Sequence, residues 1–375
     1  MIGAIFYAAK ILKNNHIDVE KLTYFFHIVA YIIFLLYLCT RIRKKMEVLT
    51  DIMQPVENAW RGYERVMEQC LRSDNRLQQE VLAYVGSRRG KQLRPLVTIL
   101  SAQLCNPVTD KTFRTAAALE LLHTASLVHD DVVDSSDTRR GMAAVHTKWG
   151  NKIAILVGDY MLAKVIGLIA EVRNTRILEI VSNLGKSLSS GELVQLHVGQ
   201  SMWIDEERYM QIIDQKTAQL FQACAEAGAE SAGCTQRQRT ALHEFGRMLG
   251  ICFQIKDDLF DYSDLEDIGK PTMSDLRDGK VTLPLIASLN RATKEEAEHI
   301  REIGELLAAH SESIDQDKVL QEIKSFVLRY RGDEYAVQLM NECKQKAIEA
   351  LSVFHDCVEK TSLIRLLDFA INRIH

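Results

Sequence analysis

The chain has 375 residues, 47% hydrophobic and 26% charged, and its 46 Lys and Arg against 50 Asp and Glu give a formal net charge of −4. This composition is that of an ordinary globular protein, so it excludes bulk disorder, a collagen-like chain and a small disulfide scaffold. The weakly acidic balance gives no support to nucleic-acid binding, which needs a basic surface. With 5 Pro and a single Asp-Gly pair at 278–279, long helices are predicted rather than hairpins and sheets.

The N-terminal extension, residues 1–45, contains a hydrophobic segment. Residues 22–40 hold no Asp, Glu, Lys or Arg, and a basic cluster follows them at 41–45. This length is just enough to cross a bilayer, and the cluster would keep the following residues on the cytoplasmic side. The alternative, which we favour, is that translation begins at Met46 and that the extension is a start-site artefact, because nothing after Met46 resembles a membrane protein. Both interpretations predict a cytoplasmic body, residues 46–375, and the first adds association with a membrane.

The body is predicted to be one all-α domain, a single large helical bundle. Apolar residues recur every three or four positions over long stretches, which is typical of amphipathic helices. Thr235 with Gln238, and Thr293 with Glu296, have capping-box spacing at the start of two such stretches. The predicted helices include Thr112–Asp134, Lys152–Val172, Glu206–Gly228 and Gln236–Asp261. Two long polar connections follow two of these helices, at 135–151 and 262–281, and connections of such length are usually functional.

The eight cysteines are spread along the whole chain. They stand at positions 39, 70, 105, 224, 234, 252, 343 and 357. No two of them form a Cys-x-x-Cys pair, and several lie inside apolar helical stretches. We therefore predict reduced thiols in a cytoplasmic protein rather than a disulfide framework or a zinc site.

The strongest signal is an acidic motif that closes two of the predicted helices. Its sequence is Asp-Asp-Val-Val-Asp at 130–134 and Asp-Asp-Leu-Phe-Asp at 257–261. The first and third aspartates of each motif are four residues apart and so share one helix face, where like charges repel by about 1 kcal/mol even in water. A helix C-terminus disfavours anions further. The repetition therefore indicates a bound cation, and hard carboxylate oxygens suit Mg²⁺. The predicted metal ligands are Asp130, Asp131, Asp134, Asp257, Asp258 and Asp261.

Basic residues follow each acidic motif. Arg139 and Arg140 lie in the first long connection, and Lys270 and Lys280 lie in the second. Because each connection leaves the same end of its acidic helix, these side chains can close over one mouth, where metal ions with Arg and Lys form a recurring clamp for diphosphates. A third basic segment, Gly-Lys-Gln-Leu-Arg-Pro at 90–95, can bind a second diphosphate, although alone it is only a basic loop before a helix.

In combination and in this order, these motifs resemble the trans-prenyl diphosphate synthases, also called polyprenyl synthetases, and most closely their long-chain, octaprenyl-type members. The resemblance runs from about Met46 to the C-terminus and includes Lys216-Thr217 and Phe253-Gln254. The one departure noticed is Gln92, which stands where a basic residue is usual. The resemblance implies the all-α isoprenoid synthase fold with a central cavity, a requirement for Mg²⁺, and a homodimer.

The resemblance also implies a role for each matching residue. The six aspartates would bind Mg²⁺ that bridges the diphosphate of an allylic substrate such as farnesyl or geranylgeranyl diphosphate. The catalytic residues would be Lys216, Thr217 and Gln254. The substrate-binding residues would be Lys91, Arg94, His123, Arg139, Arg140, Lys270 and Lys280, of which Lys91, Arg94, His123 and Arg140 would hold isopentenyl diphosphate.

The length of the product depends on what lies beneath the metal site. Ser126 and Ala125 precede Asp130 by four and five residues, which places them roughly 6–7.5 Å below it along a helix. Both side chains are small, whereas an aromatic residue there would block a growing tail. In the family, small residues at these positions accompany long products, so we predict a product longer than geranylgeranyl diphosphate, used for a quinone side chain.

Two other functions fit parts of the sequence. A class I terpene cyclase shares the helical fold and one aspartate-rich motif, but its second metal motif normally differs and it needs no site for isopentenyl diphosphate. A non-catalytic subunit of a heteromeric synthase keeps the fold but tends to lose aspartates. The two complete acidic motifs, together with Lys91 and Arg94, favour the active synthase.

Overall fold

The structure is a computed structural model that describes residues 47–87, 90–198, 203–262, 273–309 and 314–373. The chain divides into two units after Ile52, and the elements of the predicted site all lie in the second. The extension 1–45 and its hydrophobic segment 22–40 lie outside the described residues, so both interpretations of them stay predictions.

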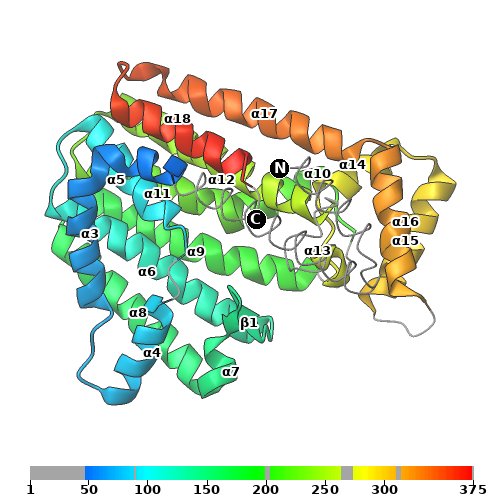
Figure 1. Cartoon of the computed structure of the whole chain (residues 1–375), viewed down its shortest axis with the longest axis horizontal. Helices are drawn as coiled ribbons and strands as arrows, with labels where there is room; N and C mark the ends of the chain where they lie inside the picture. Colours follow the sequence, from blue (N-terminus) through cyan, green and yellow to red (C-terminus); the bar gives the residue numbers. More distant parts are fainter. Residues whose placement is uncertain (1–46, 88–89, 199–202, 263–272, 310–313, 374–375) are drawn as a thin grey trace, which may run out of the picture. The chain divides into compact units, whose positions relative to one another are not determined.

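The second unit is built almost entirely from helices, which confirms the predicted fold class (Figure 1). The first half contains η1 (Gln54–Val56), α3 (Glu57–Cys70), α4 (Arg76–Ser87), α5 (Leu93–Cys105), α6 (Asp110–Val133), β1 (Thr138–Arg139), β2 (Met142–Ala143), α7 (Val145–Trp149), α8 (Asn151–Val172) and α9 (Thr175–Val198). The second half contains α10 (Glu206–Ile213), η2 (Asp214–Ala218), α11 (Gln219–Ser231), α12 (Gln236–Asp261), α13 (Ser274–Arg277), α14 (Leu283–Arg291), α15 (Lys294–Ala308), α16 (Gln316–Arg329), α17 (Gly332–Ala350), η4 (Leu351–Val353) and α18 (Val358–Ile371).

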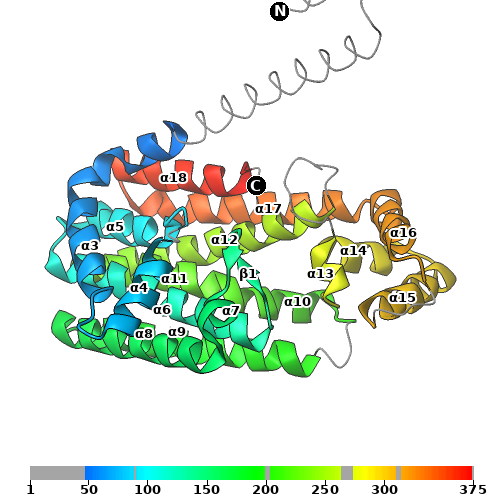
Figure 2. The ribbon, with the colours of Figure 1, turned by 60° about the horizontal axis from the view of Figure 1, so that its bottom comes forward.

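Helix α11 is the centre of the bundle. It packs against α5, α6, α9 and α12, and nearly all of its side chains are buried, as expected of a helix that is apolar on every side. Figures 1 and 2 show α8 and α9 along one side of this core and α17 and α18 along the opposite side. The two helices that end in acidic motifs, α6 and α12, therefore lie between outer layers that hold them in place.

Glycines let α12 approach its neighbours closely. A Cβ atom on Gly246 would lie 2.6 Å from the carbonyl oxygen of Phe221, and one on Gly250 would lie 2.4 Å from Cα of Ala218. Such distances are far inside van der Waals contact, so any side chain at either position would push the helices apart. The contact at Gly250 fixes α12 against η2, about two turns before the acidic motif that begins at Asp257.

Most of the predicted helix boundaries are confirmed. The structure has α6, α8 and α12 within two residues of the predicted ranges, and Thr235 and Gln238 form a capping box. Thr293 also accepts the backbone N–H of Glu296 at the start of α15. The predicted helix Glu206–Gly228 is interrupted, because residues 214–218 form the π-helix η2 between α10 and α11.

The two long connections are more ordered than the sequence indicates. The first forms the hairpin β1–β2, in which Thr138 pairs with Ala143 and Arg139 with Met142, followed by α7. Arg140 and Gly141 at its tip both have positive φ, 53° and 73°, as a type I′ turn requires. The second connection contains α13, while residues 263–272, including Lys270, lie outside the described residues.

Candidate active site

The first acidic motif is neutralised by an arginine from the hairpin that follows it. Asp131 is 2% exposed, and its Oδ1 accepts hydrogen bonds from Nε and Nη2 of Arg139 at 2.7 and 2.6 Å. Burial and the nearby charge of Glu192 raise the pKa of Asp130 to about 6. Asp134 is exposed at the end of α6. One aspartate thus has its own counterion, and its neighbour retains a proton more readily than usual.

The second acidic motif is compensated by residues from distant elements. Oδ1 of Asp257 lies 2.7 Å from Nη2 of Arg373, a residue near the C-terminus that is only 7% exposed. Asp258 is buried and accepts hydrogen bonds from the hydroxyl of Tyr209 at 2.5 Å and from Nε2 of Gln254 at 2.9 Å. Although both bonds favour the carboxylate, burial raises the pKa of Asp258 to about 7.

Asp261, the third aspartate of the second motif, holds the following connection. Its Oδ2 accepts the backbone N–H of Asp275 at 2.8 Å, and its carbonyl oxygen accepts that of Met273 at 3.2 Å. The backbone N–H of Lys280 donates to the carbonyl of Asp275 at 2.8 Å, and Nζ of Lys280 lies 3.6 Å from Asp278. These bonds keep α13 and Lys280 next to the acidic end of α12.

The π-helix η2 reaches both acidic helix ends. Nζ of Lys216 lies 3.2 Å from Oε2 of Glu192, and its charge is close enough to favour the ionised form of Asp130. The next residue, Thr217, donates its hydroxyl to Oε1 of Gln254 at 2.7 Å, and Gln254 in turn holds the second motif. Single π-turns inside α-helices are frequent at functional sites. One short segment, η2, therefore has a side chain near each of the two acidic motifs.

Four of the predicted diphosphate ligands form a basic cluster beside α5. His123 is surrounded by Arg94, Arg140 and Arg139, and burial followed by these charges lowers its pKa well below the usual value. A Cβ atom on Gly90 would lie 2.9 Å from Cζ of Arg140, so the guanidinium rests directly against the backbone of this loop. A neutral imidazole among several arginines is a site that favours an anion.

Arg94 links this basic cluster to the second acidic motif. Its guanidinium lies 5.0 Å from the centre of the Phe221 ring, and burial lowers the pKa of Arg94 although Asp257 is near enough to oppose this effect. Its Nε is buried without a hydrogen-bond partner among the described residues. Lys91 lies further out, with Nζ 5.8 Å from the centre of the Phe369 ring in α18. A buried unpaired donor in a cationic cluster indicates a missing acceptor, such as a phosphate oxygen.

The residues present suit a hard divalent cation. Among the described parts of the chain, no three His, Cys, Asp or Glu side chains lie close enough together to form a ready-made metal centre. The donors are nevertheless carboxylate oxygens from two helix ends, and the raised pKa values of Asp130 and Asp258 are what crowded, buried carboxylates show when positive charge is insufficient. A cation that is completed by substrate phosphates fits this arrangement.

Two residues of the site have no clear signal in the sequence. Tyr209 lies in an amphipathic helix, where a buried tyrosine is ordinarily a core residue, and only the fold brings its hydroxyl to Asp258. Glu192 stands in α9, far along the chain from its partner Lys216 in η2. A charged residue that interrupts a helical stretch is the one hint that the sequence contains for Glu192.

The chain is similar in sequence to known proteins. A family model described as polyprenyl synthetase matches residues 75–323. Octaprenyl diphosphate synthase from Escherichia coli is 35% identical over 312 residues, which are 82% of this chain and 93% of that protein.

Two solved structures have the same fold. A polyprenyl synthase from Caulobacter crescentus, complexed with calcium and isoprenyl diphosphate, is 33% identical with a TM-score of 0.78 and covers 87% of this chain and 98% of its own. A decaprenyl diphosphate synthase from Rhodobacter capsulatus is 31% identical with a TM-score of 0.80 and covers 87% of this chain and 99% of its own. From its motifs, its fold and these similarities, the chain belongs to the polyprenyl synthetase family.

Proposed function

We propose that the chain is a magnesium-dependent prenyltransferase that condenses isopentenyl diphosphate with an allylic diphosphate to give a long-chain all-trans polyprenyl diphosphate for a quinone side chain. The observation that carries this proposal is the position of η2, whose Lys216 and Thr217 reach one acidic helix end each. The basic cluster of Arg94 and Arg140 around His123 would offer a second anion site. Two diphosphate substrates need two such sites, and the similarity to octaprenyl and decaprenyl diphosphate synthases supports the reaction and the long product.

The first half of the reaction needs charge stabilisation rather than a protein nucleophile. Mg²⁺, when held by the six aspartates, would neutralise the allylic diphosphate and make it a better leaving group. Lys216 and Arg139 would bind the oxygen atoms of the departing diphosphate. The Thr217 hydroxyl donates its hydrogen bond to Oε1 of Gln254. The lone pairs of Thr217 Oγ1 would therefore be available to face the positive charge that develops on the allylic carbon.

The second half joins the two substrates. Arg94, His123 and Arg140 would hold the diphosphate of isopentenyl diphosphate so that its double bond attacks the allylic cation and forms the new carbon–carbon bond. The proton lost from the product would pass to the diphosphate that has departed. Water must be excluded while the cation exists, which gives the ordered hairpin β1–β2 and the connection after α12 a covering role.

A direct assay tests this proposal. The purified full chain is incubated with Mg²⁺, farnesyl diphosphate and labelled isopentenyl diphosphate, and the products are separated by chain length. A polyprenyl diphosphate longer than geranylgeranyl is expected. A cyclic hydrocarbon would identify a terpene cyclase instead, and no turnover would identify a non-catalytic subunit.

Product length rests on the small residues below Asp130. Ala125 is buried, and the hydroxyl of Ser126 donates to the carbonyl of His123 at 2.9 Å, so neither side chain projects far from α6. Ala125→Phe is expected to shorten the product while activity persists, with Ser126→Ala as the matched control that leaves length unchanged. The same product from Ala125→Phe and the unaltered chain would contradict a tail that grows along this part of α6.

A homodimer is part of the proposal, and the outer face of α8 supports it. Helix α8 is strongly apolar, and three of its large apolar side chains face solvent: Ile155, Leu156 and Ile166 are 44, 65 and 70% exposed. An apolar face of this kind marks an interface, and a second copy of the chain is the occupant that the family implies. Sedimentation should give a dimer that Leu156→Asp with Ile166→Asp dissociates. Binding of the full chain to lipid vesicles, lost in the same double variant, would indicate a membrane surface instead.

A cytoplasmic location is the last part of the proposal. The seven cysteines in the described part of the chain are free thiols, which suits a reducing compartment. Among the described residues, α8 is the one helix long and apolar enough to span a membrane, and it packs against α6 in the bundle. Fractionation of cells that express the full chain, with the N-terminus of the product determined by mass spectrometry, tests both the location and the extension 1–45.

A further inference from the structure

Two cysteines meet at the ends of α5 and α12 that are remote from the diphosphate sites. Cys105 is the last residue of α5, and Cys234 lies two residues before α12 begins. The side-chain amide of Asn106 donates to the carbonyl oxygens of Ala232 and Gly233 at 3.0 and 3.2 Å. These bonds hold the connection after α5 against the connection before α12. They bring the neighbouring residues Cys105 and Cys234 close enough for each thiol to affect the pKa of the other.

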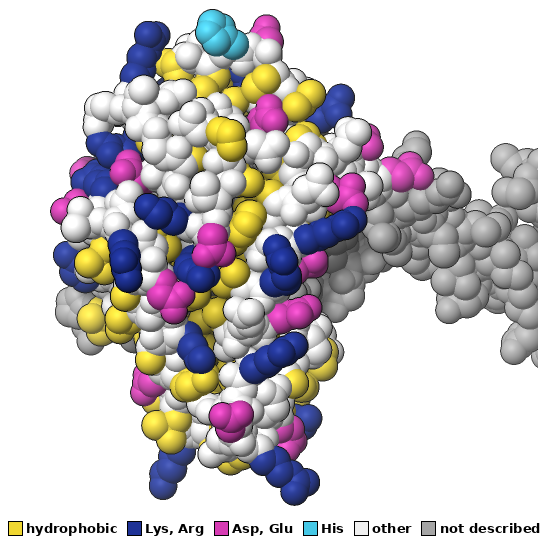
Figure 3. All heavy atoms as spheres, turned by 90° about the vertical axis from the view of Figure 1, so that its left-hand side faces the viewer, with side chains coloured by type: hydrophobic (Ala, Val, Ile, Leu, Met, Phe, Trp, Pro, Cys, Tyr) yellow, Lys and Arg dark blue, Asp and Glu magenta, His cyan; other side chains and the backbone are white. Residues whose placement is uncertain are grey.

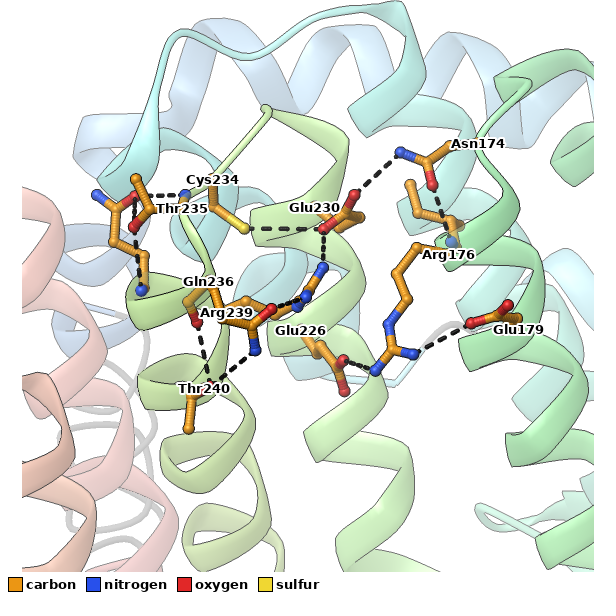
Figure 4. A network of polar contacts seen from close by, with 12 residues as sticks. Asn174, Arg176, Glu179, Glu226, Glu230, Cys234, Thr235, Gln236, Arg239 and Thr240 are labelled. Carbon is orange, nitrogen blue, oxygen red and sulfur yellow. Dashed lines mark hydrogen bonds and ion pairs between the residues drawn. The ribbon is translucent and has the colours of Figure 1, made fainter.

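The surroundings of Cys234 are polar but balanced in charge (Figure 4). Its Sγ lies 4.0 Å from Oε2 of Glu230, and the same oxygen accepts a hydrogen bond from Nη1 of Arg239 at 2.8 Å. Asn174 donates to the other carboxylate oxygen of Glu230 at 3.3 Å. The glutamate is therefore compensated by its own partners, and the thiol also lies at the N-terminus of the 26-residue helix α12, where the helix dipole favours an anion.

The two thiols are unequal, which suits a nucleophile and a resolving group. Interaction with Cys105 lowers the pKa of Cys234, while interaction with Cys234 and burial raise the pKa of Cys105. Both are half-buried, whereas the thiols at 70, 224, 252 and 343 are buried. Figure 3 shows the side of the molecule on which α3 lies, where charged side chains of both signs lie among groups of apolar ones.

We propose that Cys105 and Cys234 form a reversible disulfide that cross-links α5 to α12 when the thiol pool becomes oxidising. The Cys234 thiolate attacks one sulfur of a low-molecular-weight disulfide, which forms a mixed disulfide and releases one thiolate. The sulfur of Cys105 then attacks that of Cys234 and breaks the mixed bond, and the second thiolate leaves with the proton that Cys105 loses. Two protein thiols are oxidised, and one small disulfide is reduced to two thiols.

The cross-link would join α5 and α12 at the ends opposite to those that carry the site residues. Helix α5 carries Arg94 at its other end, and α12 carries Asp257 and Asp258 at its other end. Because the two cysteines are far apart along the chain, a bond between them removes much conformational freedom from the unfolded state. Oxidation is therefore expected to stabilise the bundle that positions both diphosphate sites, without touching either site.

The test is a redox titration of the full chain in glutathione buffers. Samples are acid-quenched, alkylated and digested without reduction, and cross-linked peptides are identified by mass spectrometry. We expect a Cys105–Cys234 peptide while the other thiols are still alkylated, and a melting temperature several degrees higher for the oxidised chain. Cys234→Ser should abolish the cross-link and the shift in melting temperature, whereas Cys357→Ser, a control at another half-buried thiol, should keep both.

A second variant separates chemistry from packing. Cys105→Ala leaves the attacking thiol without a resolving partner, so glutathione should stay attached to Cys234 as a mixed disulfide. A purely structural role for the pair would not produce that adduct. The proposal is overturned if both thiols of the unaltered chain remain free after full oxidation, or if the cross-link joins a different pair, for example one that includes Cys39.

Discussion

The two acidic helix ends have counterions of different origin. At the end of α6, Asp131 is neutralised by Arg139, eight residues later in the hairpin that the helix itself leads into. At the end of α12, Asp257 is paired with Arg373 near the C-terminus, and the neighbouring carboxylate is held by Tyr209. The counterion of Asp131 is thus local in the sequence, whereas the partners of the second motif come from distant elements of the bundle.

This difference implies that the two ends respond differently to damage. Arg139 reaches Asp131 from the hairpin β1–β2 that follows α6, so this ion pair spans eight residues of the chain. The second end needs α10, η2 and α18 in place, so changes far from Asp258 should reach it. If the two ends do not serve one centre, variants at one end should act independently of variants at the other.

The largest effect is expected from removing one charge at each end. Asp131→Asn and Asp258→Asn should each lower kcat by about 10²–10³-fold, since each would remove a carboxylate from the proposed shared centre for the departing diphosphate. The double variant should be little worse than either single one, because residues that act as a unit are not additive. Steady-state kinetics with saturating Mg²⁺ and both substrates measure this.

Asp137→Asn is the matched control, because Asp137 is an exposed aspartate in the first connection whose side chain makes no contact with either motif in the described structure. It should keep near-normal kcat. Independent, multiplicative losses in the double variant would argue for two separate sites and against the proposed centre.

A smaller effect is expected from removing the counterions. Arg139→Gln leaves the buried Asp131 without its cation and should lower kcat/KM for the allylic substrate about 10–100-fold, the usual cost of breaking a charged hydrogen bond in a buried site. Arg373→Gln should cost less, about tenfold or below, because Asp257 is less buried, but it should lower the melting temperature.

The reason for that loss of stability is that Arg373 also donates to the carbonyl of Phe253 at 2.7 Å and lies 3.5 Å from the centre of its ring. Arg365→Gln, at an exposed position of α18, is the control and should change neither quantity. If Arg373→Gln abolished activity while Arg139→Gln did not, the counterion of the second end would contribute more to activity than that of the first, contrary to this prediction.

The same contrast explains what the sequence could predict. The acidic motifs, the basic residues that follow them and the helix Gln236–Asp261 depend on local spacing, so periodicity and capping residues were enough to place them. The hairpin at 138–143 was missed because its signal is the Arg140-Gly141 turn, and Arg rarely adopts positive φ. The π-helix and the roles of Tyr209 and Glu192 arise from contacts between distant elements, which a single sequence does not encode in any local pattern.

The raised pKa of Asp258 gives a pH test of metal binding. Its pKa rises from 3.8 to about 7 on folding, so the metal-free native state holds a proton that the unfolded state has released, and this contribution to stability is lost as the pH rises through 7. Mg²⁺ needs the carboxylate, so its apparent affinity should increase by up to about tenfold per pH unit below 7 and level off above it. Melting temperatures measured across MgCl₂ titrations at several pH values check this.

Asp258→Asn should flatten that pH dependence at the cost of weaker metal binding, whereas Asp137→Asn should leave the profile unchanged. An affinity for Mg²⁺ that is the same on both sides of pH 7 in the unaltered chain would show that Asp258 is not a ligand.

The smallest effect is expected where η2 meets the second end. Thr217→Val keeps the shape of the side chain but removes the hydroxyl that donates to Gln254, so the amide that holds Asp258 becomes free to rotate. Loss of one such hydrogen bond is worth about 1 kcal/mol, or roughly a fivefold decrease in kcat, while Thr217→Ser should retain most activity because it keeps the hydroxyl. Since Thr217 adjoins Lys216, which serves the first end, the Val variant should leave KM for the allylic substrate unchanged. If that KM increased by the same factor as kcat fell, the change at the second end would also have weakened substrate binding at the first, and η2 would couple the two ends.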